Sequence, residues 1–105
     1  MSADALRAVA AQIERGWSQG ADARDADGRA VPLISDAARA WSPLGAFALL
    51  ATDGIPTDHV RRALVAFADV TGANSLQEWN DAPERNRGEV LSALQEAIER
   101  VEDAR

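Results

Sequence analysis

The chain contains no cysteine and a single histidine, His59. Without cysteine it can build neither a disulfide framework nor a thiolate metal site, and one histidine leaves a zinc site short of ligands. Nothing in the sequence points to an oxidising compartment. We therefore expect no metal and no cofactor.

Membrane and targeting features are missing as well. No stretch approaches the roughly 18 uninterrupted apolar residues that span a bilayer. Met1 to Asp4 contains no basic segment that leads into an apolar run. We expect a cytoplasmic protein that makes no membrane contact.

Lysine is absent too, and the eleven arginines face seventeen acidic residues, which gives a net charge of −6. This balance disfavours direct nucleic-acid binding, because such proteins use a basic face to displace counterions from phosphates. The acidic residues are interleaved with arginines, so we interpret the mixed surface mainly as a solubility device. An inhibitor that mimics DNA with a row of carboxylates is the alternative.

Hydrophobic periodicity predicts an all-α fold, a small compact bundle of about four helices plus a short helical turn. The length of 105 residues and the hydrophobic content of 47% predict one domain, residues 1–105, with one core. Ser2 can cap the first helix, and Gly16 stands near its end. The inward positions of this helix are Leu6, Val9, Ala10, Ile13 and Trp17.

The stretch over residues 18–35 loses the helical pattern. Its turn residues predict an irregular loop or a weak β-hairpin between the first two helices. In the hairpin, Asp27-Gly28 would reverse the chain between residues 23–24 and 30–31.

Pro43 interrupts the second helix, because proline removes one backbone hydrogen bond and clashes with the preceding turn. The helix either begins after a Ser35 cap and kinks at Pro43, or restarts with Ser42 as cap and Pro43 as first helical residue. An apolar stripe keeps its phase across the proline, which favours the kink. The stripe consists of Ala37, Ala40, Trp41, Leu44, Ala48 and Ala51.

The third helix is predicted from Thr57, which can cap it, to Gly72, which can end it. A capping side chain accepts a hydrogen bond from a free first-turn N–H, and glycine tolerates the left-handed conformation that closes a helix. The inward positions of this helix are Val60, Leu64, Phe67 and Val70.

Two capping boxes mark the C-terminal part of the chain. Ser75 and Glu78 have the required spacing, which predicts a short helical turn over residues 76–79. Asn86 and Glu89 repeat the spacing before the last helix. The inward positions of the last helix are Val90, Leu91, Leu94, Ala97, Ile98 and Val101.

The three tryptophans are the most informative local feature, because each lies near an end or break of a predicted helix and precedes a small polar residue. Indole combines a large apolar area with one N–H that needs an acceptor, so it suits the boundary between a core and a polar cavity. Converging rings and their polar neighbours would rim a site for a small molecule or a partner. The candidate binding residues are Trp17, Gln19, Arg24, Trp41, Trp79, Asn80 and Asp81.

Structural interpretations of the same residues stay open. The rings can simply fill the core of an alanine-rich bundle, where small side chains leave space. Asn80-Asp81, just before Pro83, can do no more than shape a turn.

Catalytic and metal motifs are weak or absent. His59 has no cysteine or second histidine to form a nucleophile pair, and we expect it to be exposed. The segment Asp25 to Gly28 resembles part of a calcium loop, but Ala23 and Ile34 stand where its first and last ligands would be. No serine lies in a nucleophile elbow, and the glycines lack the spacing of a phosphate loop.

An ordered set of short motifs covers the chain from about Leu6 to Val101. The motifs are Gly16-Trp17-Ser18-Gln19-Gly20, Ala23-Arg24-Asp25-Ala26-Asp27-Gly28, Ala40-Trp41-Ser42-Pro43-Leu44-Gly45-Ala46, Trp79-Asn80-Asp81 and the Glu89-Val90 helix. Together they resemble a domain of unknown function found in short proteins of high-GC bacteria and their phages. The resemblance implies a common fold and a common site near the tryptophans, without a known activity. Cysteine often follows the first two tryptophans in that family, whereas Ser18 and Ser42 stand here, which argues against a thiol-based role.

Three functions follow from these observations. The first is a non-enzymatic binding or protein-interaction module, whose Trp-rimmed surface engages a small molecule or a partner protein. The second is an acidic inhibitor, of phage or host origin, that blocks a nucleic-acid-binding partner. The third is a small hydrolase or transferase with Asp81, Asp25 or His59 as acid or base, which ranks last because no pair at productive spacing is evident.

Overall fold

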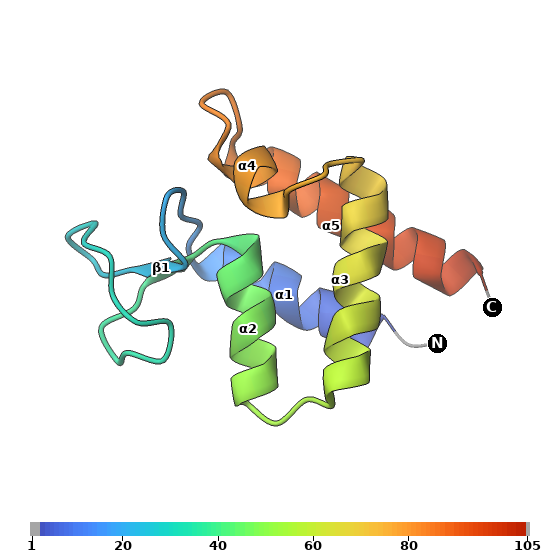
Figure 1. The fold of residues 1–105 in the computed structure, drawn as a ribbon, viewed down its shortest axis with the longest axis horizontal. Coiled ribbons are helices and arrows are strands. Elements are labelled where there is room, and N and C mark those ends of the chain that lie inside the picture. The colour runs from blue at the N-terminus through green and yellow to red at the C-terminus, as the bar shows by residue number, and fades with distance from the viewer. Residues whose placement is uncertain (1–2, 105) are drawn as a thin grey trace.

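A computed structural model describes residues 3–104 of the chain. Within these residues, five helices and two short strands follow one another, and none of the helices is long and apolar enough to cross a membrane. The elements are α1 (Asp4–Arg15), β1 (Ala23–Arg24), β2 (Ala40–Trp41), α2 (Pro43–Thr52), α3 (Thr57–Thr71), α4 (Leu76–Asp81) and α5 (Arg87–Asp103). The expected all-α bundle, with an irregular connection after the first helix, is confirmed (Figure 1).

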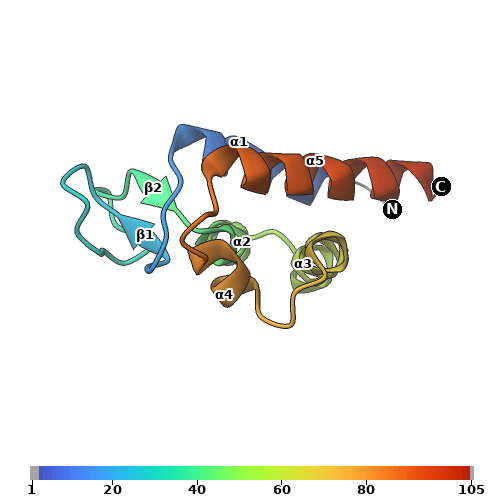
Figure 2. The same cartoon turned by 90° about the horizontal axis from the view of Figure 1, so that it is seen from above.

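The helices form two layers. Figure 2 shows α1 and α5 side by side in one layer, with α2, α3 and α4 in the layer beneath. The molecule measures 21 Å along its shortest axis, about the thickness of two packed helices. Because each layer turns its apolar side chains toward the other, the core forms between them.

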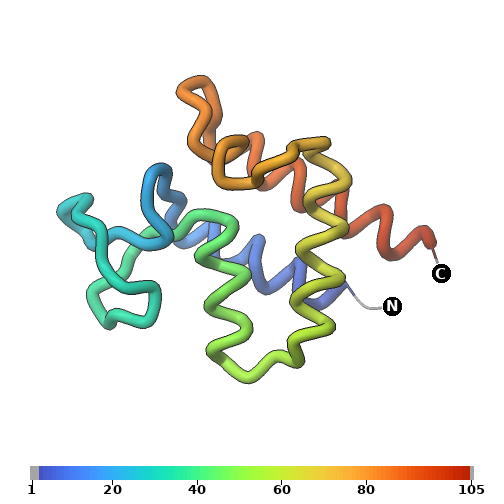
Figure 3. The backbone as a smooth tube through the Cα atoms, viewed as in Figure 1, coloured from blue at the N-terminus to red at the C-terminus, as the bar shows by residue number. Residues whose placement is uncertain are grey.

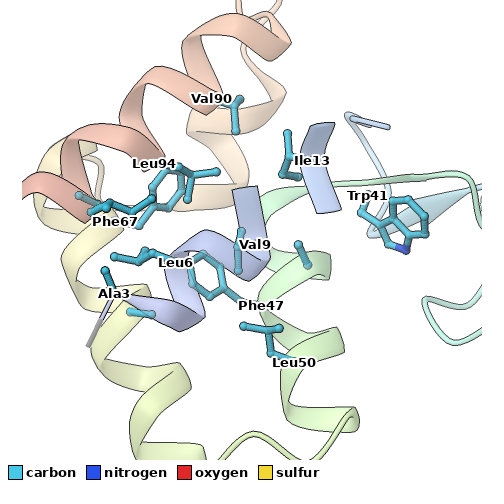
Figure 4. Packing of buried hydrophobic residues seen from close by; sticks show 14 of the residues in the cluster. Ala3, Leu6, Val9, Ile13, Trp41, Phe47, Leu50, Phe67, Val90 and Leu94 are labelled. Atoms are coloured by element: carbon cyan, nitrogen blue, oxygen red, sulfur yellow. The ribbon is translucent and has the colours of Figure 1, made fainter. Parts of the chain in front are cut away.

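The centre of the core lies where α1 and α5 meet α3. Leu6, Val9, Phe67 and Leu94 are at most 1% exposed, and Figure 4 shows them grouped around Phe47. Burying each such side chain contributes about 1.5–3 kcal/mol. The apolar faces predicted for the first and last helices are confirmed, except at residue 17, because α1 ends two residues earlier.

The expected kink at Pro43 is wrong, because α2 begins there. The Ser42 hydroxyl accepts a hydrogen bond at 3.0 Å from the backbone N–H three residues later, so Ser42 is the cap. Residues 40–41 form a strand, and the helical phase therefore starts at the proline. Ala48 and Ala51, which the predicted stripe placed inward, are exposed. The buried apolar side chains of α2 are Pro43, Ala46, Phe47 and Leu50.

The predicted hairpin between residues 23–24 and 30–31 is present only in part. Arg24 makes a single antiparallel bridge to Ala30, whereas the regular partner of β1 is β2. This pairing sets the buried Ala23 opposite the buried Trp41. Burial against the bundle therefore decides which strand pairs with β1, and the rest of the connection projects from one end of the layers (Figure 3).

The predicted caps of α4 and α5 are largely confirmed. Asn86 and Glu89 form the reciprocal capping box. At α4 only the hydroxyl half is present: Ser75 Oγ accepts from the Glu78 N–H at 3.2 Å. α4 also continues two residues beyond the predicted turn and includes residues 80–81.

The predicted C-terminal end of α3 is confirmed, whereas its predicted N-terminal cap is wrong. Gly72 ends the helix with a left-handed φ of 66°, as expected. Thr57 is not the cap, because Pro56 occupies the cap position and Thr57 is the first helical residue. The predicted cap of the first helix, Ser2, lies outside the described residues.

Gly16 has no room for a side chain. A Cβ atom at this position would lie 2.0 Å from the carbonyl oxygen of Arg39, because the chain that leaves α1 runs against the chain that enters β2. The Gly16 carbonyl oxygen also accepts a hydrogen bond from the Trp41 N–H at 3.0 Å. We predict that Gly16→Ala lowers the free energy of unfolding by about 1–3 kcal/mol, because a methyl group forces these segments apart.

Gly88→Ala is the matched control for this measurement. Gly88 lies in the first turn of α5, where an added Cβ would lie 3.2 Å from the side-chain atom Asn86 Oδ1 and meets no backbone atom outside the helix within 4 Å. Alanine favours a helix over glycine by up to about 1 kcal/mol, so this variant should be neutral or more stable. Urea denaturation of both variants checks the prediction, and a Gly16→Ala curve that coincides with that of the parent would contradict it.

Candidate functional site

A buried asparagine joins two segments that are distant in the sequence. Asn80, in the last turn of α4, is 2% exposed. Its Oδ1 atom accepts a hydrogen bond from Trp17 Nε1 at 2.8 Å, and its Nδ2 donates to the Ser18 carbonyl at 3.0 Å. Because a buried polar group without a partner costs about 1–3 kcal/mol, this pairing fixes residues 17–18 against α4.

Gln19 and Asp81 extend this contact, and we refer to residues 17–20 and 80–82 as the Asn80 junction. Gln19 Nε2 donates to the carbonyl oxygens of Asn80 and Ala82, at 2.8 and 2.9 Å. Asp81 Oδ1 accepts from the Gly20 N–H at 2.9 Å. These predicted binding residues therefore hydrogen-bond to the backbone of the opposite segment.

Arg24 reinforces the junction from β1. Its Nε and Nη2 atoms donate to the Gln19 carbonyl oxygen at 3.1 and 2.9 Å, and Nη1 donates to the Gly28 carbonyl oxygen at 2.8 Å. The guanidinium group thus crosslinks the segment after α1 to the turn of the partial hairpin.

The three tryptophans occupy different environments. Trp17 and Trp41 lie on adjacent segments, joined by the Ser18 N–H, which donates to the Trp41 carbonyl at 3.0 Å. Trp79 instead packs edge-on against Phe67, with ring centroids 5.6 Å apart, and the Arg85 guanidinium lies 4.1 Å from its ring centroid. The structure therefore places Trp17 and Trp41 on adjacent segments and Trp79 among α3, α4 and α5.

Trp41 contributes area rather than a hydrogen bond. Its side chain is buried, and Figure 4 shows it apart from the central group of apolar residues. Among residues 3–104 its Nε1 donor has no hydrogen-bond partner. The Arg15 guanidinium lies 5.5 Å from its ring centroid.

The space beside the Asn80 junction is small. A hollow of about 30 Å³ lies between α4 and the start of α2, and its lining includes Asn80, Asp81 and Leu44. This volume is close to that of one water molecule. Trp17 and Trp41 line neither this hollow nor the two larger ones described below.

A larger cavity lies elsewhere, and sequence analysis did not find it. It has a volume of about 430 Å³ and is lined by Asp4, Ala5, Leu6, Ala8, Leu50, Ile55, Pro56, His59, Arg62, Ala63 and Val101. We call it the α1–α3 cavity. Its lining comes from four helices and the α2–α3 connection, so no local motif signals it. The only hint in the sequence was His59, which is exposed as expected and lies at this cavity.

The residues considered for catalysis are held in separate places. Asp25 Oδ1 accepts from the N–H groups of Asp27 and Arg29, both at 2.9 Å, and so shapes a turn. Asp81 belongs to the Asn80 junction, and neither carboxylate lines the cavity that contains His59. Among residues 3–104, no three histidine, aspartate or glutamate side chains are grouped so that they could hold a metal ion.

The sequence profile of DUF6197, described as a family of unknown function, matches residues 1–100. The chain belongs to this family. No curated protein and no solved structure matches the chain significantly. The expectation of an uncharacterised domain family is confirmed, and the DUF6197 match includes the whole Asn80 junction.

The Asn80 junction of this DUF6197 chain can be tested by removing its central amide. Asn80→Ala leaves Trp17 Nε1 and the Ser18 carbonyl without partners, so we predict a loss of about 2–4 kcal/mol in the free energy of unfolding. Asn74→Ala is the control, because Asn74 is exposed in the loop before α4. Thermal and urea denaturation measure both variants, and equal stabilities would show that the junction does not hold the fold together.

Asp81 separates a structural role from a binding role. Asp81→Ala removes the acceptor of the Gly20 N–H and should lower stability by about 0.5–1.5 kcal/mol. Asp81→Asn keeps an acceptor oxygen and should recover much of that loss. Paired melting curves check this expectation, and two variants as stable as the parent would contradict a structural role.

Proposed function

We propose that the protein is a non-catalytic binding module, and that its binding site is the α1–α3 cavity. The observation that carries the proposal is the composition of the cavity walls. Leu6, Leu50, Ala63 and Val101 are buried members of the core and face the cavity. Apolar walls with a few polar groups at the edge are typical of small-molecule sites.

The size of the cavity supports this assignment. Its volume of about 430 Å³ falls in the range of roughly 300–1,000 Å³ that small-molecule sites occupy. Ile55 is 36% exposed, and His59 and Arg62 supply hydrogen-bond donors. An uncharged or amphipathic molecule with a short apolar body fits these properties.

The Trp-rimmed surface is a weaker candidate for the binding site. The polar side-chain groups of Trp17, Gln19, Asn80 and Asp81 are engaged across the Asn80 junction, and the Trp41 Nε1 donor is buried. A ligand would have to break those hydrogen bonds. Exchanging a hydrogen bond within the protein for one to the ligand gains little free energy, because the two bonds are similar in strength. We therefore assign the junction to structure and the cavity to binding.

The acidic-inhibitor alternative receives little support from the surface. Several carboxylates pair with arginines one turn away, as in Glu89 with Arg85 and Glu96 with Arg100. A mimic of the phosphate backbone needs unpaired carboxylates in a row. At these positions of α5 and the segment before it, acidic and basic side chains instead stand next to one another.

Titration with n-hexanol, followed by two-dimensional amide NMR, tests the proposed site. We expect saturable shifts at amides that line the cavity, such as those of Ala5, Ala8 and Ala63. Ala8→Phe adds a ring at an exposed position of the lining and should weaken binding about fivefold or more, because it occupies the cavity entrance.

Ala48→Phe is the matched control, because Ala48 is exposed on α2 and lines none of the described hollows. It should bind hexanol like the parent protein. Shifts that spread over the surface without saturation, or equal binding by Ala8→Phe, would overturn the proposal.

A further inference from the structure

A second hollow lies between the exposed sides of α3 and α5. It has a volume of about 430 Å³ and is lined by Arg61, Arg62, Val65, Ala66, Asp69, Arg100, Val101 and Ala104. We call it the α3–α5 groove. It adjoins the α1–α3 cavity, because Arg62 and Val101 line both.

The spacing of the groove residues explains its shape. On α3, Arg62, Val65, Ala66 and Asp69 follow helical spacing and form a face next to the core face that contains Phe67. Small side chains, alanines above all, fill the space between α3 and α5 only in part, which leaves a shallow groove. Val65 is 53% exposed, which is unusual for a large aliphatic side chain at a helix seam.

An apolar floor between two helices is the surface on which a third helix packs. In such complexes an amphipathic helix sets residues at positions i, i+3 or i+4, and i+7 into the groove. The floor here consists of Val65, Ala66, Val101 and Ala104. The groove follows α3 from Arg61 to Asp69, about two helical turns, and meets α5 at its C-terminal end.

The rim of the groove is basic, although the chain carries a net charge of −6. Three arginines and one aspartate line it. Arg61 makes no ion pair among residues 3–104, and Arg62 lies 3.8 Å from Asp58, one turn earlier on the same exposed face. Arg100 pairs with Glu96 in the same way, at 2.6 Å. Exposed pairs of this kind contribute only about 0.3–0.5 kcal/mol, so a partner's carboxylates can compete for these arginines.

The basic rim distinguishes two occupants of the groove, a second copy of this chain and a different protein. In a symmetric dimer, each groove would meet a copy of itself, and two rims with three arginines and one aspartate each would be brought together. Like charges across an interface disfavour association. A partner that carries carboxylates beside its apolar residues gains attraction at the same positions.

We propose that the α3–α5 groove docks an amphipathic helix of a partner protein, with carboxylates flanking the apolar stripe of that helix. The docked helix contacts Val65 and Val101 with its apolar stripe and places its carboxylates next to Arg61 and Arg100. This interaction is distinct from ligand binding in the α1–α3 cavity.

Two synthetic helical peptides test this assignment. Both carry the same leucine stripe over about four helical turns, with glutamates on both flanks in one peptide and lysines in the other. In amide NMR titrations of the full chain, we expect the glutamate peptide to shift Val65, Ala66, Val101 and Ala104. The lysine peptide should bind about tenfold more weakly or not at all.

Arg61→Glu supplies the decisive variant. It should weaken the glutamate peptide about tenfold and strengthen the lysine peptide, because it reverses one charge of the rim. Arg29→Glu is the control, because Arg29 is an exposed residue of the partial hairpin and the change in net charge is the same. It should leave both affinities unchanged.

Three results would overturn the proposal: no saturable binding of the glutamate peptide at millimolar concentration, equal affinities of the two peptides, or shifts outside the groove. Dimerisation of the parent protein through Val65, seen as a concentration-dependent mass that Val65→Ser abolishes, would also overturn it. Arg61 does not line the α1–α3 cavity. Hexanol binding by Arg61→Glu therefore reports on the cavity independently of the groove.

Discussion

The hydrogen bonds of the Asn80 side chain hold the irregular part of this protein against its helices. The long connection from α1 to α2 buries Ala23, Ala38 and Trp41. Apolar burial is not directional, however, so it does not by itself fix the position of this segment. Asn80 supplies the anchor because its amide both accepts from Trp17 Nε1 and donates to the Ser18 carbonyl inside the fold. A buried amide tolerates only a geometry that satisfies both of its ends, and it therefore specifies position as well as adding stability.

The three tryptophans show how one residue type serves three physical roles. Trp17 acts through its N–H, which Asn80 accepts. Trp41 acts through its apolar area, covering the end of the core next to β1. Trp79 acts through its ring faces and edges, in contact with Phe67 and Arg85. Similar sequence contexts around the three rings thus do not imply a shared pocket.

Structure and proposed binding are separated in space. The strands and the Asn80 junction lie at one end of the layers, whereas the start of α1 and the end of α5 lie at the other (Figure 1). The two hollows flank α3 near that second end and share Arg62 and Val101. Helices supply most of their lining, together with the α2–α3 connection at the cavity, so their shape depends mainly on side-chain size along α1, α3 and α5. This arrangement lets the binding surfaces vary without disturbing the hydrogen bonds that hold the connection.

Local signals in the chain predict several of the helices and their ends. The Asn86–Glu89 capping box, the Gly72 stop and the apolar faces of the first and last helices depend on residues within a few positions of one another. Each of these signals lies within a single segment, which is why periodicity and capping residues predict them. Local signals did not settle where α2 begins, because a kinked helix and a new helix that starts at Pro43 satisfy the same local rules.

The remaining features depend on contacts between distant segments of the chain. Residues 40–41 form a strand that pairs with β1 and sets the buried Trp41 opposite the buried Ala23. No local pattern predicts this contact, because the two strands are far apart in the sequence. Trp17, Gln19, Asn80 and Asp81 were all candidate binding residues from the sequence, but the hydrogen bonds between residues 17–20 and 80–82 were not predicted. The α1–α3 cavity and the α3–α5 groove were not predicted at all, since their linings come from several helices. The physical reason is the same in each case: hydrogen-bond partners and empty space depend on how distant segments pack, whereas a sequence pattern records only what each segment prefers alone.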